Sequence, residues 1–309
     1  MTNKRSVRVR RGNAETVIVA GVSITHPNKL WWPGEGTTKQ DVARYYASIA
    51  PYILRWLKNR RLTAERCPDG IEGECFFQKD FSDDLRLGVS THGIPAESSG
   101  KIVHYVVGGS TETLLALVNL GCIAVHVMNC RIQSLDRPDW LAFDLDPSSG
   151  NFSDAAKAAT VLREVLTELK IVAFPKTSGG RGLHILVPLR HGPDQEQVRA
   201  FAHQISREVA EREPKLVTVQ MSKSKRRGKV FADWIRNAFG QTIASPYSLR
   251  SRVSAPVSTP LDWDEVDPDL DPSSFNLHTI ERRLGRKDPW ADFWIRPQTL
   301  PNLDQELRP

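Results

Sequence analysis

The sequence contains few cysteines and no long apolar segment, and each shortage excludes a class of protein. Its 309 residues include four cysteines, and no two of them have a CxxC spacing. We therefore expect no structural zinc site, no redox pair and no disulfide scaffold. The longest apolar runs, such as residues 114–120, are far shorter than the roughly 18–20 residues that span a bilayer. The N-terminus is basic but lacks the apolar segment of a secretory signal, so we expect a cytoplasmic protein.

Positive charge is in modest excess and is unevenly distributed. Lysine and arginine number 42 against 36 acidic residues, a formal net charge of +6. Five cations and no acid fall in residues 4–11, and five more cations fall in residues 223–229. Two dense basic segments indicate contact with phosphate groups. Residues 1–13 have no apolar period and are predicted to form a flexible basic arm, and residues 301–309 a loose tail.

The hydrophobic pattern predicts an α/β fold, with an α+β mixed sheet. Helices are predicted at 38–58, 111–120, 153–169, 194–213 and, as a short one, near 279–285. Strands are predicted at 17–22, 62–65, 76–78, 101–107, 122–128, 140–145, 171–175, 182–188, 217–219 and 230–233. Thr38 and Asp41 have the spacing of a capping box at the start of the first helix, and Pro51 predicts a break or kink within it.

Aspartates end two of the predicted strands. Alternation along a strand places Asp144 and Asp146 on the same face, and two adjacent carboxylates favour a hard divalent cation such as Mg²⁺ or Mn²⁺. Asp233 ends a second strand, directly after the basic segment 223–229. If the two strands are neighbours, the three acids resemble a two-metal phosphoryl-transfer site. The simpler interpretation is that Asp146 caps a turn and Asp144 pairs with an arginine.

A glycine-rich segment, residues 176–188, leads into another apolar strand. Its glycines let backbone N–H groups approach an anion, and Ser178, Arg181 and His184 can each donate to phosphate oxygens. It has neither the GK[ST] ending of a Walker A loop nor a GxGxxG fingerprint, and the alternative is a tight β-hairpin turn. His126, in an apolar strand, is interpreted most simply as a satisfied core histidine.

Taken in order, these motifs resemble the archaeo-eukaryotic primase superfamily and, more narrowly, the polymerase domain of the bacterial ATP-dependent DNA ligase D of non-homologous end joining. The segments that carry the resemblance are FDLDP at 143–147, TSGGRGLH at 177–184, FADW at 231–234, PYSLR at 246–250, HPNKLWWP at 26–33 and FFQK at 76–79. The resemblance covers about residues 17–300. It implies one primase-polymerase domain at 14–300, with an N-terminal lobe at about 14–115 and a catalytic core at about 116–300. His26 and Arg236 depart from the family pattern, which has a small polar residue and a neutral amide there.

The resemblance implies a template-directed DNA/RNA nucleotidyltransferase that fills short gaps and extends 3′ ends with NTPs or dNTPs in end joining or gap repair. It implies a two-metal site for Mn²⁺ or Mg²⁺. By position, the implied site residues are Asp144, Asp146 and Asp233 for the metals, His126 as a further active-site residue, Ser178, Arg181, His184, Arg226 and Arg250 for the nucleotide, Lys29 and Lys39 for a DNA 5′-phosphate, and Phe76 and Phe77 for stacking on the template. Ordinary core packing is the alternative for the two phenylalanines.

The implied partners are gapped or end-containing DNA with a 5′-phosphate, nucleoside triphosphates, a separate DNA ligase and a Ku-like end-binding protein, at the bacterial nucleoid. The chain lacks a lysine-centred adenylation module, so we expect a free-standing polymerase or an excised domain. Two alternatives stay open: a primase that makes primers de novo, and a non-catalytic module that binds 5′-phosphorylated DNA ends. A haloacid-dehalogenase-like phosphatase is disfavoured, because Ser148 stands where that family has threonine or valine.

Overall fold

The structure, a computed structural model, describes residues 15–96 and 100–303. The basic arm predicted at residues 1–13 and residues 304–309 of the predicted tail lie outside the described residues. In the described part of the chain, no helix is both long and apolar enough to cross a membrane.

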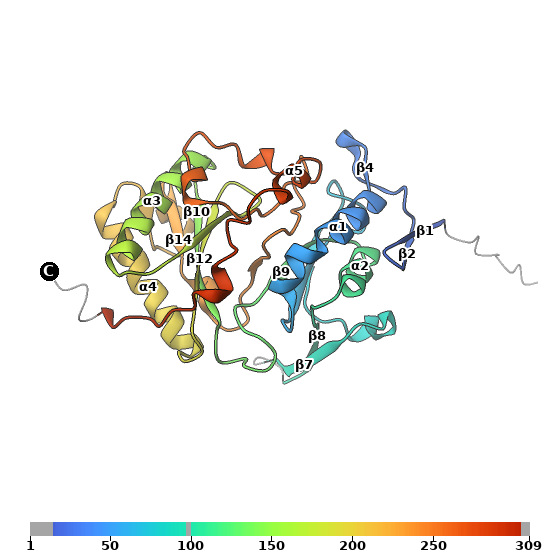
Figure 1. The fold of residues 1–309 in the computed structure, drawn as a ribbon, viewed down its shortest axis with the longest axis horizontal. Helices are drawn as coiled ribbons and strands as arrows, with labels where there is room; N and C mark the ends of the chain where they lie inside the picture. The colour runs from blue at the N-terminus through green and yellow to red at the C-terminus, as the bar shows by residue number, and fades with distance from the viewer. Residues whose placement is uncertain (1–14, 97–99, 304–309) are drawn as a thin grey trace, which may run out of the picture.

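Two β-sheets with their helices lie side by side (Figure 1). The helices are α1 (Lys39–Leu57), α2 (Thr111–Asn119), α3 (Phe152–Glu168), α4 (Gln195–Arg212) and α5 (Glu281–Leu284). The five-stranded sheet has the order β11 (Phe174–Thr177), β12 (Leu183–Pro188), β10 (Trp140–Pro147), β14 (Val230–Asp233) and β13 (Val217–Thr218). The four-stranded sheet has the order β15 (Ile243–Ala244), β9 (Cys122–Val127), β5 (Leu62–Arg66) and β6 (Phe76–Gln78). Three two-stranded sheets pair β1 (Thr16–Val19) with β2 (Val22–Thr25), β3 (Leu30–Trp32) with β4 (Thr37–Thr38), and β7 (Thr91–Pro95) with β8 (Ile102–Val106).

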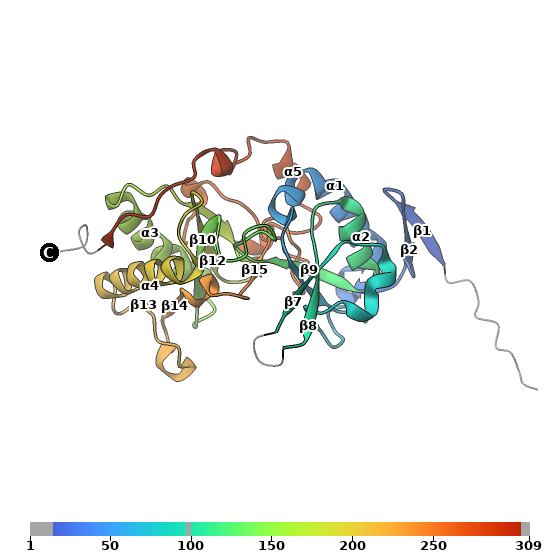
Figure 2. The ribbon, with the colours of Figure 1, turned by 90° about the horizontal axis from the view of Figure 1, so that it is seen from below.

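The five-stranded sheet has two different faces, and the alternation along β10 shows them. Leu141, Phe143 and Leu145 pack into the core that α3 and α4 cover, whereas Trp140 and Ala142 belong to a separate core on the opposite side. Figure 2 shows α3 and α4 together on the outer side of this sheet. The strand after Ala142 therefore presents its polar residues to the face that the helices leave open.

The four-stranded sheet is covered by α1 and α2. Thr38 and Asp41 form a capping box that begins α1, as the sequence indicates, and buried residues such as Tyr46 and Ile53 pack one side of the helix against the sheet. The helix runs through Pro51 as one continuous element, so the chain does not break there.

An aromatic cluster joins the two halves of the molecule. Trp56 of α1 packs against Trp290 and Phe293 of the C-terminal segment, with ring centroids 5.2 and 4.8 Å apart, and Phe293 reaches Phe174 of β11 at 5.1 Å. In Figure 1 this segment, drawn in red, crosses from α5 beside α1 back to the five-stranded sheet. The core on the open side of the five-stranded sheet therefore also contains residues of the four-stranded sheet.

Several elements differ from the sequence predictions. The run predicted as one strand at 17–22 is a hairpin, because Ala20 and Gly21 have positive φ and form the turn between β1 and β2. The strand predicted at 171–175 begins later, at Phe174. The strands β3, β4, β7 and β15 were not predicted.

The cysteine prediction was wrong in one respect, because Cys67 and Cys75 form a disulfide. The chain between them turns back at Gly70, whose φ is +82°, and the two Cα atoms come within 4.3 Å. A separation of eight residues matches no short cysteine motif, which is why the spacing did not reveal the pair. Cys122 and Cys130 are free and buried.

Candidate active site

Three aspartates meet on the open face of the five-stranded sheet. β10 and β14 are antiparallel neighbours, and Asp144 lies directly opposite Asp233 in the register. Asp146 is two residues further along β10 and therefore on the same face, whereas Leu145 points into the helical core. The sequence required these two strands to be neighbours, and the pairing confirms that they are.

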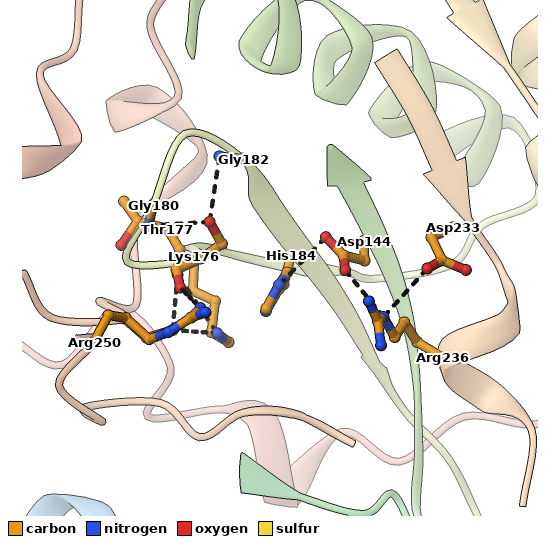
Figure 3. A network of polar contacts seen from close by, with 11 residues as sticks. Asp144, Lys176, Thr177, Gly180, Gly182, His184, Asp233, Arg236 and Arg250 are labelled. Atoms are coloured by element: carbon orange, nitrogen blue, oxygen red, sulfur yellow. Dashed lines mark hydrogen bonds and ion pairs between the residues drawn. The ribbon is translucent and has the colours of Figure 1, made fainter. Parts of the chain in front are cut away.

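An arginine and a histidine lie among the carboxylates. The Arg236 Nε lies 3.2 Å from Oδ2 of Asp144 and 3.2 Å from Oδ2 of Asp233, and the His184 Nε2 lies 3.4 Å from Oδ1 of Asp144. Figure 3 shows these four side chains in a row. Burial alone would raise the pKa of Asp144, but His184 and Arg236 together hold this pKa well below its ordinary value. The pKa values of Asp146 and Asp233 are raised by burial and by the negative charge of Asp144.

The donor set suits a hard divalent cation. Three carboxylates on one face supply oxygen ligands, and the raised pKa values of Asp146 and Asp233 report a repulsion that a cation between the carboxylates relieves. Within residues 15–96 and 100–303, no three acidic, histidine or cysteine side chains are already grouped closely enough to bind a metal ion. Arg236 supplies the positive charge between Asp144 and Asp233 instead.

The glycine-rich segment is a tight hairpin that also holds an arginine in place. β11 and β12 pair up to Thr177 and Leu183, and the Ser178 hydroxyl accepts hydrogen bonds from the backbone N–H groups of Gly180 and Gly182, at 3.2 Å each. The Arg250 Nη1 donates to the backbone oxygen of Ser178 at 2.7 Å. The hairpin interpretation is therefore correct for the backbone, and the turn holds Arg250 on the far side of His184 from Asp144 (Figure 3).

Lys176 lies beneath this turn and is fully buried. Its Nζ donates to the Ser258 hydroxyl and lies 3.4 Å from the backbone oxygen of Thr177. Burial and the charge of Arg250 lower the pKa of Lys176 well below its ordinary value. The same burial, together with Lys176, lowers the pKa of His184 to about 4, so this imidazole is neutral at physiological pH.

The four-stranded sheet contributes a histidine and two aromatic rings. His126 has its Nε2 3.9 Å from Oε2 of Glu65, and burial lowers its pKa to about 4. The Phe77 ring meets His126 edge-on, with centroids 5.2 Å apart. Phe76 and Phe77 are 42% and 58% exposed, so the core-packing alternative for these two residues is wrong.

A cavity of about 400 Å³ lies between the two sheets and brings most of these groups together. One side carries Thr63, Phe77, Lys79 and His126, the other carries Asp144, His184, Arg236 and Arg250, and residues 240–244 close it. Residues from strands far apart in the sequence therefore face one half-open cavity, which is the usual arrangement of a ligand site.

The remaining candidate residues lie outside this cavity. Lys29 forms an ion pair with Asp69 at 2.6 Å, and the Lys39 Nζ donates to the backbone oxygen of Asn119 at 3.0 Å. Burial and the charge of Lys29 lower the pKa of Lys39 to about 8. The two lysines are therefore close enough to repel each other near the start of α1.

Arg226 and Arg181 lie near Asp146. Both lower the pKa of Asp146 by their charge, although burial and Asp144 leave it raised overall. The Arg226 guanidinium lies over the Phe231 ring, 3.4 Å from its centroid. Arg226 belongs to the basic loop between β13 and β14, which projects from the sheet in Figure 2.

Sequence reasoning missed three residues of the site. Glu65 faces His126, Lys176 supports the hairpin, and Asn237 is buried behind Arg236. The alternation of β5 carries a weak signal for Glu65, because an acid two residues beyond Thr63 falls on the same face. Nothing local distinguishes the other two.

Comparisons with known proteins agree on one family. The model of the family described as LigD, primase-polymerase domain, matches residues 38–290. The multifunctional non-homologous end joining protein LigD of Pseudomonas aeruginosa is 36% identical over 295 residues, which are 94% of this chain and 35% of that protein. The bifunctional non-homologous end joining protein LigD of Bacillus subtilis is 32% identical over 288 residues, covering 91% of this chain and 45% of that protein. This chain thus spans less than half of the length of either relative.

A solved structure shares the fold. The polymerase domain of Mycobacterium tuberculosis ligase D, solved in complex with DNA, matches with a TM-score of 0.82 and 29% sequence identity. The match covers 90% of this chain and 99% of that chain, which confirms the mixed α/β architecture. The chain therefore belongs to the LigD primase-polymerase domain family and is an enzyme of the nucleotidyltransferase class.

Proposed function

We propose that this chain is a template-directed polymerase that fills short gaps and extends 3′ ends of DNA with NTPs or dNTPs during end joining or gap repair. The observation that carries the proposal is the placement of Asp144 opposite Asp233, with Asp146 on the same face, and Asp144 itself lines a cavity that also carries cations and an aromatic ring. Both a phosphoryl-transfer centre and a base-stacking surface are needed to copy a template, and one cavity supplies them.

In this proposal Asp144, Asp146 and Asp233 hold two Mn²⁺ or Mg²⁺ ions. When bound, such ions lower the pKa of the attacking 3′-hydroxyl and neutralise the charge of the leaving pyrophosphate. Asp144 is suited to this role because its low pKa keeps it ionised throughout the physiological pH range. The face of β10 that carries these acids is free of the helices that cover the other face, so substrate reaches it from the cavity.

The nucleotide contacts of the proposal are Ser178, Arg181, His184, Arg226 and Arg250. Arg250 supports this assignment most directly, since its buried Nε has no hydrogen-bond partner in the described residues while its Nη1 is tied to Ser178. A buried donor without a partner is costly, and a triphosphate oxygen would satisfy it. The neutral His184 binds by hydrogen bonding rather than by charge. His126 faces the same cavity from the opposite sheet.

The DNA contacts of the proposal lie along the four-stranded sheet. Phe76 and Phe77 expose ring surface on which an unpaired template base stacks, an interaction worth about 1–3 kcal/mol per base. Lys29 and Lys39, near the start of α1, bind the 5′-phosphate at the far side of a gap. The solved relative in complex with DNA supports DNA as the ligand of this fold. A separate DNA ligase, a Ku-like protein and a place at the bacterial nucleoid complete the proposal.

Primer extension on a gapped duplex, with Mn²⁺ and either ribo- or deoxynucleotides, tests the function. We expect Asp144→Asn and Asp233→Asn to abolish incorporation, and the exposed Asp136→Asn to leave it unchanged. A downstream 5′-phosphate should increase incorporation by the wild-type chain but not by Lys29→Ala. Unchanged incorporation in the Asp144 and Asp233 variants would refute the proposal. Phosphate-dependent DNA binding without any incorporation would favour the end-binding module instead.

A further inference from the structure

Arg236 occupies the position between two carboxylates that the proposed function assigns to a metal ion. It lies on a short 3₁₀ turn, Ile235–Asn237, directly after β14. Its Nε is within 3.2 Å of an oxygen of Asp144 on one strand and of Asp233 on the next. One guanidinium therefore joins both strands across the ladder, as Figure 3 shows.

The backbone on both sides of Arg236 is tethered, so this contact is built into the fold. The Asp233 carboxylate accepts from the backbone N–H of Ile235 at 2.9 Å. On the other side, the buried Asn237 side chain binds the backbone N–H and oxygen of Ala142 at 2.8 and 2.7 Å. The root of the arginine side chain is thus fixed beside the acids.

The guanidinium end, by contrast, is partly exposed. The Arg236 side chain is 38% exposed and lines the cavity, whereas the side chains of Asp144 and Asp233 are 15% and 13% exposed. A half-exposed arginine loses little when it exchanges one partner for another, because exposed ion pairs are weak. The acids are therefore more buried than the cation that pairs with them.

Arginine and a divalent metal compete for the same two carboxylates. Metal–oxygen bonds are about 2.0–2.2 Å long for the smaller ions, and such a metal would contact the Oδ2 atoms that Arg236 now contacts. Two cations in that space repel each other strongly. Metal binding therefore favours departure of the guanidinium, and the cavity that Arg236 lines is the space into which it can turn.

We propose that Arg236 is a resident counter-cation that competes with the divalent metal for Asp144 and Asp233, and that it turns to the phosphates of the nucleotide when the metal displaces it. The inference rests on the proposed function, because it assumes that these acids bind metal. It makes Arg236 a positioning residue with two states. It also couples the two ligands, since a nucleotide that accepts the guanidinium favours the state that binds metal.

Mn²⁺ binding, measured from the electron paramagnetic resonance of free Mn²⁺, tests this without any turnover. The full chain is titrated as wild type, Arg236→Gln and Arg236→Lys, with the exposed Arg207→Gln as a control of equal charge change. Without nucleotide, we expect Arg236→Gln to bind Mn²⁺ about three- to tenfold more tightly than wild type, which corresponds to the loss of two partly exposed ion pairs. Arg236→Lys should fall between the two. Arg207→Gln should match wild type.

A second titration contains a non-hydrolysable nucleoside triphosphate. The nucleotide should tighten Mn²⁺ binding by a larger factor in wild type than in Arg236→Gln, because only the wild type has a guanidinium to transfer. Equal or weaker Mn²⁺ binding by Arg236→Gln, or an equal gain in Arg207→Gln, overturns the inference. Circular dichroism of each variant shows whether it is folded, and Arg236→Lys preserves the test if the glutamine variant unfolds. Absence of Mn²⁺ binding in every chain would overturn the metal site too, whereas primer extension that fails despite Mn²⁺ binding refutes only the proposed function.

Discussion

Replacing Asn237 by alanine removes a side chain that extends the hydrogen-bond pairing between β10 and β14 beyond the last paired residues. β10 and β14 pair from Asp144 onwards, so Ala142 has no partner on β14. The Asn237 amide takes that place, since its Oδ1 accepts from the Ala142 N–H at 2.8 Å and its Nδ2 donates to the Ala142 oxygen at 2.7 Å. The same Nδ2 donates to the backbone oxygen of Trp234 at 3.0 Å. One side chain therefore ties the strand of Asp144 to the turn that carries Arg236.

The cost of this substitution follows from the two backbone groups that it leaves unpaired. Asn237 and Ala142 are fully buried, so neither the N–H nor the oxygen of Ala142 has access to bulk water. Each unsatisfied buried group costs about 1–3 kcal/mol. Partial entry of water into the vacated space lowers the sum, and we expect Asn237→Ala to reduce the free energy of unfolding by about 2–4 kcal/mol.

Guanidinium chloride denaturation followed by circular dichroism measures this difference, with Asn28→Ala as the matched control. Asn28 is exposed, and we expect its replacement to change the free energy of unfolding by less than about 0.5 kcal/mol. Nucleotide incorporation by Asn237→Ala should also fall, because Asp144 and Arg236 lose their shared support. A decrease in the free energy of unfolding below about 1 kcal/mol would show that the Asn237 amide is not needed to satisfy the backbone groups of Ala142.

Three further predictions follow from other parts of the molecule. Trp290→Ala removes a fully buried ring from the aromatic cluster and should lower the free energy of unfolding by about 3–5 kcal/mol in the same denaturation experiment, and a loss under about 1 kcal/mol would contradict the packing described. Because the pKa of Lys39 is lowered to about 8, its charge is lost as pH rises through that value. The increase in DNA affinity that a 5′-phosphate gives should therefore shrink between pH 7 and pH 9. An increase that stays constant over this range would exclude Lys39 from the contact. Maleimide should label no cysteine in the native, unreduced chain and two after denaturation, since Cys122 and Cys130 are buried and Cys67 is bonded to Cys75, whereas four labels would show that the disulfide is absent.

The sequence predicted the local parts of the site well. The capping pair Thr38 and Asp41 marked the start of α1, and the alternation along β10 put Asp144 and Asp146 on one face. Both signals depend on residues within a few positions of one another, where backbone geometry fixes the outcome. The fold class followed from the same periodicities and is confirmed by the solved relative.

The parts that could not be predicted depend on pairing between distant segments. β15 has two residues and exists as a strand because it pairs with β9, more than a hundred positions earlier. Arg236 appeared in the sequence only as a departure from a family pattern, and its contact with two strands requires the register of β10 against β14. The roles assigned to Lys29, Lys39 and the nucleotide-binding residues stay predictions.

The aromatic cluster of Trp56, Phe174, Trp290 and Phe293 has a mechanical consequence. Close-packed rings hold α1 against β11, the edge strand of the five-stranded sheet. Close-packed interiors have low compressibility and transmit strain. Packing of this kind opposes hinge motion between the two halves of the molecule. The two sides of the cavity between the sheets are therefore expected to keep their spacing, and a ligand that enters must adapt to it.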